Sequence, residues 1–177
     1  MAHELNTPRL RLRNWQVEDL PSWIAMNSDP ITLKYFPRTF TEAESRASFE
    51  RIKSFLELNK FGLWAAEEKE TEKFMGFIGL SEQNVEGIAF TPCIEIGWRL
   101  DREYWGRGYA TEGALEVLKF GQESLKFDQI FSYTSRINSP SINVMKKIGL
   151  RARSELDFDH PKIQAGELLR DHVVFST

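Results

Sequence analysis

The alternation of hydrophobic and polar residues predicts a strand and then two helices in the first third of the chain. Residues 9 to 15 place leucines and arginines at alternate positions, which is typical of a half-buried strand. Residues 17 to 27 space their apolar side chains at near-helical intervals, and Pro21 fits only in the first turn of such a helix. A second helix is expected at residues 41 to 59, where Thr41 and a glutamate three positions later form a capping-box signature.

From residue 61 onward the pattern predicts mainly strands, with two further helices between them. Strands are predicted at residues 62 to 66, 74 to 80, 93 to 100, 129 to 133, 150 to 156 and 171 to 175. One helix is expected to begin at a glycine turn and to continue to about Phe120. The other is predicted at residues 139 to 147, with Pro140 in its first turn and Gly149 just after its end.

This order of elements predicts the fold class. Three consecutive strands with short connections favour an antiparallel meander, whereas the strand–helix–strand unit from 93 to 133 favours a parallel pair. We therefore expect an α+β fold, in which one mixed, mostly antiparallel sheet carries helices on both faces. The 177 residues contain no repeat and no linker, so they are expected to form a single domain over residues 1 to 177.

Composition and charge narrow the class of protein. The net charge of −3 does not suit a dedicated nucleic-acid binder, so no nucleic-acid partner is expected. Cys93 is the only cysteine, which excludes an internal disulfide and a thiolate metal cluster. No run of 18 apolar residues occurs. We expect a cytoplasmic monomer or homodimer with no metal and no membrane attachment.

The segment Trp105-Gly106-Arg107-Gly108-Tyr109-Ala110 contains the clearest candidate binding site. It lies between a predicted strand and a predicted helix. Two glycines one residue apart let the backbone turn tightly and approach a ligand closely. The helix that begins there directs unpaired N–H groups and the positive end of its dipole into the same space. A strand, a glycine turn and a helix N-terminus together predict a phosphate-binding cradle.

Three interpretations of this turn compete. A dinucleotide-binding fingerprint needs a third glycine at position 111, but that residue is Thr111. A P-loop needs a glycine followed by Lys and Ser or Thr at fixed spacing, and no such string occurs. The third interpretation is that Gly106 and Gly108 only shape a turn.

A second motif, at residues 138 to 150, favours a ligand over a simple turn. At these residues the chain resembles the GNAT superfamily of acetyl-CoA-dependent N-acetyltransferases. The pyrophosphate motif of that family, [Q/R]-x-x-G-x-[G/A], matches at Gly108 and Ala110, with Trp105 in place of Gln or Arg. That exchange and the string YWGRGYATE resemble the ribosomal-protein acetyltransferase branch. The second family motif, N-x-x-S-x-x-[VL]-x-x-K-x-G-[FL], matches at Asn138, Ser141, Val144, Lys147, Gly149 and Leu150.

The resemblance implies acetyl-CoA as co-substrate and a primary amine as acceptor, either a protein N-terminus or a small molecule. It implies that the pantetheine arm lies between the strands at 93 to 100 and 129 to 133. The cofactor-binding residues it implies are Trp98, Trp105, Gly106, Arg107, Gly108, Tyr109, Ala110, Thr111, Asn138 and Ser141. For Arg107 the alternative is a solvated side chain, and for Asn138 it is a helix cap.

Acetyl transfer to an amine needs a proton acceptor, and Glu95 is the preferred candidate. It lies on an otherwise apolar strand, where a buried carboxylate is costly. Its place ten residues ahead of Trp105 resembles that of the glutamate base in histone-type relatives. The alternatives are that Glu95 faces solvent or an arginine, and that His160 or His172 is the base.

The reaction also needs an oxyanion donor and a proton for the leaving thiolate. A backbone N–H near Gly97 or Trp98 is expected to meet the oxyanion. Many relatives place a tyrosine at the position of Met145, which cannot donate a proton, so Ser141 is the candidate acid, with helix capping as the alternative. The expected function is direct acetyl transfer in a ternary complex. The alternative is a non-catalytic acyl-CoA-binding module on the same fold.

Overall fold

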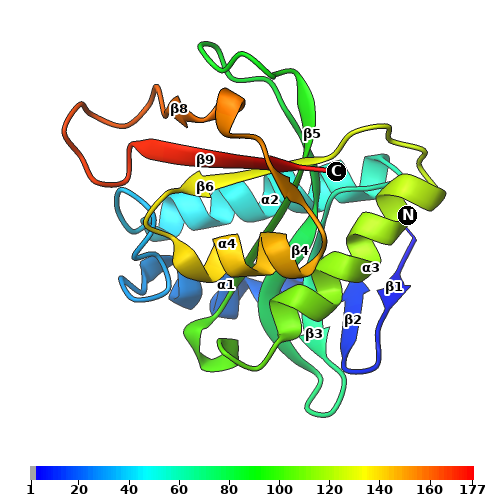
Figure 1. The fold of residues 1–177 in the computed structure, drawn as a ribbon. Coiled ribbons are helices and arrows are strands. Elements are labelled where there is room, and N and C mark those ends of the chain that lie inside the picture. Colours follow the sequence, from blue (N-terminus) through cyan, green and yellow to red (C-terminus); the bar gives the residue numbers. More distant parts are fainter. Residues whose placement is uncertain (1–2) are drawn as a thin grey trace.

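The computed structural model describes residues 3 to 177, and within them nine strands form one sheet with helices on both faces (Figure 1). The strands are β1 (Leu5–Asn6), β2 (Leu10–Arg13), β3 (Leu63–Glu68), β4 (Lys73–Gln83), β5 (Cys93–Leu100), β6 (Phe131–Ser135), β7 (Arg151–Ala152), β8 (Phe158–Asp159) and β9 (Asp171–Ser176). The α-helices are α1 (Leu20–Ser28), α2 (Glu42–Leu58), α3 (Tyr109–Glu123) and α4 (Ser139–Lys147). In Figure 1, α3 and α4 lie in front of the sheet and α1 and α2 lie behind it.

The strand order confirms the expected fold class. The sheet runs β1-β2-β3-β4-β5-β6-β9-β7, with β8 paired to β9. Over the described residues every pairing is antiparallel except that of β5 with β6. The parallel pair is the one predicted from the strand–helix–strand unit, because a connection through a helix brings the second strand back in the same direction.

The parallel pair separates almost at once. A single bridge, Glu95 to Phe131, joins β5 to β6 in the described chain. Beyond Glu95, β5 continues to Leu100 with β4 as its partner, while three residues separate the end of β6 from the start of α4. The two strands therefore form a splay that exposes backbone groups of β5 on the side away from β4.

Most predicted helices lie where the sequence placed them. Helix α4 occupies the predicted residues, and α2 begins with the expected capping box. In that box the Glu44 amide donates to Thr41 Oγ1 at 3.2 Å, and the Thr41 amide donates to Glu44 Oε2 at 2.8 Å. Pro21 lies in the first turn of α1, where its missing N–H costs nothing.

The last third of the sheet differs from the prediction. The strand expected at residues 150 to 156 is only two residues long, and a 3₁₀ turn at Ser154–Leu156 follows it. Asp157 explains the interruption, because its Oδ1 accepts the Val174 amide at 3.0 Å, a donor that a continuing strand would have used. The short strands β1 and β8 were not predicted, and β6 begins two residues later than expected.

An aromatic cluster fixes the helices behind the sheet. The Trp15 ring lies 5.2 Å from that of Trp23 on α1 and 5.4 Å from that of Phe49 on α2, both edge to face. All three side chains are buried. This packing anchors both ends of the loop at residues 29 to 41, which reaches the candidate site. Over the described residues, the structure contains no helix long and apolar enough to cross a membrane.

Candidate functional site

The glycine turn presents a run of unused backbone donors. Within residues 3 to 177, the amides of residues 106 to 111 donate to no protein atom; the first helical bond of α3 runs from the Glu112 amide to Gly108 O at 3.0 Å. Gly106 and Gly108 have φ values of 72° and 81°, a left-handed conformation that a residue with a Cβ rarely adopts. The predicted cradle is therefore a run of unpaired N–H groups at the positive end of a 15-residue helix.

Arg9 braces this turn from the N-terminal strands. Its Nε donates to Glu112 Oε2 at 2.7 Å, and its Nη1 donates to Arg107 O at 3.0 Å. Its guanidinium also lies 4.4 Å from the centre of the Tyr109 ring. These contacts hold the turn to β2 before any ligand binds, which lowers the entropic cost of ordering it.

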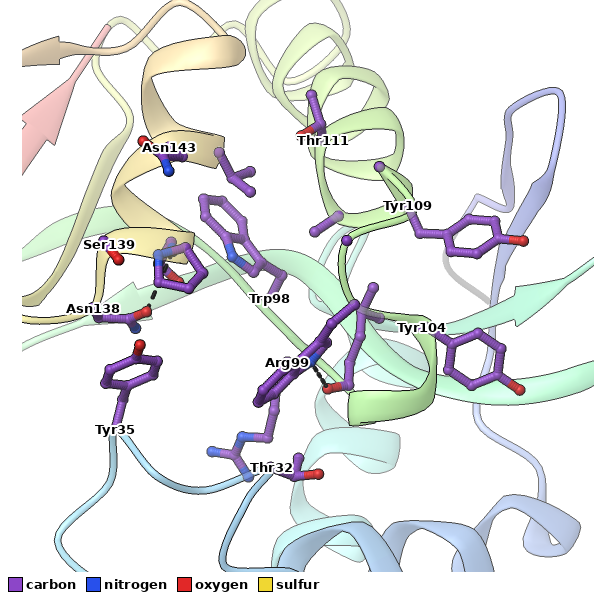
Figure 2. Close-up of a pocket in the computed structure, with 18 of the residues that line it drawn as sticks. Thr32, Tyr35, Trp98, Arg99, Tyr104, Tyr109, Thr111, Asn138, Ser139 and Asn143 are labelled. Atoms are coloured by element: carbon purple, nitrogen blue, oxygen red, sulfur yellow. Dashed lines mark hydrogen bonds between the residues drawn. The ribbon is translucent and has the colours of Figure 1, made fainter.

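Two of the expected cofactor-binding side chains point away from the cradle. Arg107 Nη2 donates to Glu68 Oε1 at 3.2 Å and to the Tyr109 hydroxyl at 3.0 Å. The Tyr109 hydroxyl itself donates to Glu68, and Figure 2 shows its ring directed away from the cavity. The side chain of Arg107 is therefore not placed as a charge on the rim of the cradle, and in the described chain the backbone amides of Arg107 and Tyr109 are the groups left without a partner.

A cavity of about 430 Å³ connects the cradle with α4 and with the loop between α1 and α2 (Figure 2). Of the expected site residues, Trp98, Trp105, Gly106, Gly108, Tyr109, Ala110, Thr111, Asn138 and Ser141 line it. The cavity is long enough to join the motif at residues 105 to 110 with that at residues 138 to 150. Two motifs that are separate in the sequence thus form one site.

The splayed edge of β5 supplies a further donor. The Asp101 amide donates to Met75 O on β4 at 2.8 Å. Because backbone groups alternate in direction along a strand, the amides of Trp98 and Leu100 point to the opposite side, into the splay. The Trp105 indole N–H donates to Leu100 O at 2.8 Å, which confirms this orientation. The amide of Trp98 is thus the first backbone donor of β5 after the Glu95–Phe131 bridge that has no partner strand.

Asn138 caps α4, which is the alternative to cofactor binding that the sequence offered for this residue. Its Oδ1 accepts the Ser141 amide at 3.3 Å, and its Nδ2 donates to Thr134 Oγ1 at 2.9 Å. The side chain is 9% exposed and lines the cavity. An amide oxygen has two lone pairs and the NH₂ group has two hydrogens, so Asn138 can cap the helix and still bind a ligand.

Ser141 lines the cavity in the first turn of α4, whereas Met145 does not. Met145 is 1% exposed and belongs to the hydrophobic core. The position that many relatives give to a tyrosine is therefore a packing position in this chain. Two hydroxyls of α4 line the cavity, those of Ser139 and Ser141, and Ser141 is the one that the sequence predicted as the acid.

Glu95 lies at the vertex of the splay, at the single bridge between β5 and β6. Its side chain is partly accessible, and it does not line the cavity described above. Burial raises the pKa of Glu95 to about 8, and the neighbouring Gln83 amide side chain opposes that rise. A carboxylate with a pKa near neutrality is suited to accept a proton, directly or through a water molecule.

The raised pKa of Glu95 predicts a pH-dependent stability. Between the ordinary carboxyl pKa of 4.5 and about 8, the folded chain binds this proton and the unfolded chain does not, so stability falls as pH rises. Because the side chain is partly accessible, we expect the loss to be on the order of 2 kcal/mol, well below the full value of 1.36 kcal/mol per pKa unit. Glu95→Gln should abolish this loss in urea unfolding at pH 5 and pH 9. Replacing the exposed Glu82 with glutamine should leave this pH-dependent loss of stability unchanged. If Glu95→Gln loses as much stability between pH 5 and pH 9 as the wild-type protein does, Glu95 is not the group that titrates.

Tyr133 on β6 lies close enough to Glu95 to sense its charge, and Phe158 and His172 pack against the Tyr133 ring. The rings of Tyr133 and Phe158 lie 5.6 Å apart, and those of His160 and His172 lie 5.0 Å apart. Burial, reinforced by the charge of Glu95, raises the pKa of Tyr133. Tyr133 was not identified from the sequence, because it is separated from Glu95 by 38 positions and only the parallel pairing brings them together.

Burial lowers the pKa of both histidines, so both are neutral at pH 7. The His172 Nδ1 lies 2.9 Å from Arg170 O, and since a carbonyl only accepts, Nδ1 carries the proton and Nε2 the lone pair. The neighbouring Asp157 and Asp159 side chains pair with Arg136 and Arg170 at 3.0 and 3.1 Å.

Known proteins resemble the chain in sequence and in fold. A family model described as Acetyltransferase (GNAT) domain matches residues 9–151. The uncharacterized N-acetyltransferase YnaD of Bacillus subtilis is 29% identical over 153 residues, which cover 83% of this chain and 82% of YnaD. A GNAT-family acetyltransferase from Bacillus anthracis superposes with a TM-score of 0.80 at 24% identity, over 99% of this chain and 98% of that one. The RimL ribosomal alpha-N-protein acetyltransferase, solved in complex with coenzyme A, has a TM-score of 0.77 at 12% identity, with 99% and 97% coverage.

Proposed function

Because the chain belongs to the GNAT acetyltransferase family, we propose that it transfers an acetyl group from acetyl-CoA to a primary amine within a ternary complex. The observation that carries the proposal is the run of unpaired amides at residues 106 to 111, joined by one cavity to the splayed edge of β5. Convergent amides at a helix N-terminus suit a pyrophosphate. An open strand edge suits the amide groups of a pantetheine arm, because they can pair with it as a further strand does.

The residues of the splay supply each part of the chemistry. The amine nitrogen attacks the thioester carbon, and its proton passes to the Glu95 carboxylate directly or through water. The carbonyl oxygen becomes an oxyanion, to which the Trp98 amide donates a hydrogen bond. The carbon–sulfur bond then breaks, and the thiolate takes a proton from the Ser141 hydroxyl or from solvent. No metal and no covalent protein intermediate enters this sequence.

The acceptor class follows from the branch that the sequence resembles. The YWGRGYATE signature supports a relationship to the ribosomal-protein N-terminal acetyltransferases, and the structural likeness to RimL supports the same fold. We propose a protein N-terminus or a small-molecule amine as acceptor. Both present the same reacting atom, a primary amine nitrogen.

The alternative function is a non-catalytic acyl-CoA-binding module. The buried Met145 favours this alternative, because it stands where many relatives have a tyrosine that can donate a proton to the leaving thiolate. The two functions differ in turnover, because a binding module takes up acetyl-CoA and releases no thiol.

A screen of primary amines and N-terminal peptides, with release of the coenzyme A thiol as readout, tests the proposal. We expect amine-dependent thiol release well above the rate without amine. Tight acetyl-CoA binding combined with no thiol release from any amine would reject the enzyme and leave the binding module.

A further inference from the structure

Arg99 on β5 carries a charge that no carboxylate balances. Within residues 3 to 177, no Asp or Glu lies within ion-pair distance of its guanidinium, and burial is the cause that lowers the pKa of Arg99 to about 10. Its one hydrogen bond to the described part of the chain runs from Nη1 to Asn27 Oδ1 at 2.8 Å. Its Nε is buried and has no acceptor. The residue as a whole is partly exposed, yet a largely desolvated cation without a carboxylate partner is costly.

Aromatic rings hold the guanidinium in place without neutralising it. Its Cζ lies 4.2 Å from the centre of the Phe36 ring. The rings of Trp23, Phe40 and Phe77 lie 5.5 to 5.6 Å away. Such contacts attract a cation, yet they leave the N–H groups without acceptors. At neutral pH the group is a rigidly placed positive charge with donors to spare.

The position of Arg99 relates this charge to the candidate site. Arg99 lines the cavity at the end where Thr32 and Tyr35 approach from the loop between α1 and α2 (Figure 2). Among the described residues that line the cavity, the charged ones are Arg99 and Lys147, both cations. Lys147 lies on α4, whereas Arg99 lies on β5, next in sequence to Trp98, whose amide is the proposed oxyanion donor.

Arg99 also shares a strand face with the proposed base. Side chains alternate along a strand, so Glu95, Gly97 and Arg99 point to the same side of β5. Their Cα atoms span about 13 Å from Glu95 to Arg99 at 3.3 Å per residue. An added Cβ at Gly97 would meet nothing within 4 Å, so the space between the two side chains is open. A molecule lying along this face can place its amine near Glu95 and a second group near Arg99.

We propose that Arg99 binds an oxyanion of the acceptor, so that the preferred acceptors are amines that also carry a carboxylate or a phosphate. This inference rests on the proposed acetyltransferase function. A guanidinium presents paired N–H groups in a planar fork that matches two oxygens of either anion. The aromatic rings set the orientation of that fork before the acceptor arrives.

The test compares acceptors that differ only in the anionic group. The carboxylate series lengthens the chain between the amine and the carboxylate, from glycine to 6-aminohexanoate, and each compound is paired with its carboxamide. A second pair, O-phosphoethanolamine and ethanolamine, tests whether a phosphate is preferred to a carboxylate. We expect the wild-type protein to favour at least one anionic amine over its neutral partner by about 30-fold in kcat/KM. Arg99→Gln should reduce that ratio to about one. A ratio within one variant is independent of the amount of folded protein, so partial unfolding does not imitate the effect.

Arg102→Gln is the matched control, since Arg102 is exposed and pairs with Asp29 at 3.5 Å. It should retain the wild-type ratio. If amines are acetylated with no preference for the anionic partner, or if Arg99→Gln retains the preference, Arg99 does not bind the acceptor and the acetyltransferase function stands. If no amine yields thiol, the proposed function itself fails.

Discussion

Replacing Glu95 with glutamine should lower kcat/KM by about 100-fold, because the variant loses its general base. It should also remove the pH dependence of the reaction. In the wild-type protein the active form is the carboxylate, so kcat/KM should rise with pH and level off above the pKa of about 8. The measurement uses a hydrazide acceptor, which is neutral across this range, so that the amine does not contribute its own titration.

The exposed Glu82→Gln serves as the control for this prediction, and it should retain both the rate and the profile. A wild-type profile that levels off below the ordinary histidine pKa of 6.5 would instead identify His160 or His172 as the base. An unchanged profile in Glu95→Gln would reject Glu95.

Gly108→Val should weaken acetyl-CoA binding by about 100-fold. Gly108 has a φ of 81°, which a β-branched residue adopts only with strain of about 1 to 3 kcal/mol. Relief of that strain would turn the amides of residues 106 to 111 away from a common point. Calorimetric titration with acetyl-CoA measures the loss.

Gly166→Val is the matched control for the backbone effect. Gly166 has a φ of 90°, lies outside the cavity and would place its Cβ in open space. It should carry the same backbone strain and bind acetyl-CoA as the wild-type protein does. An unaltered Kd in folded Gly108→Val would contradict the cradle.

The sequence predicted the elements that local patterns specify. The glycine turn, the capping box at Thr41 and the helix with Pro140 in its first turn all depend on neighbouring residues, and the structure contains each of them. The early end of the strand at Ala152 could not be predicted, because Asp157 accepts the amide of Val174, 17 positions away, which a longer strand would have used.

The candidate site shows the same division. The cradle amides and Ser141 follow from motifs, and the structure places them in one cavity. The orientation of Arg107 depends on Glu68, which lies 39 positions away, so no local pattern contained it. Likewise, the role proposed for Arg99 depends on aromatic rings that come from α1, from the loop after α1 and from β4. Only tertiary packing brings these rings together.

Direct transfer from acetyl-CoA to the amine is the central claim, and a single-turnover experiment with isotopically labelled acetyl-CoA tests it most directly. The protein is mixed with a stoichiometric amount of the labelled compound, with and without an amine that is active in the screen. We expect free thiol and labelled acetyl-amine to appear together in equal amounts, and no thiol release or labelled protein when the amine is absent. Thiol release without amine, accompanied by label on the protein, would contradict direct attack in the splay between β5 and β6.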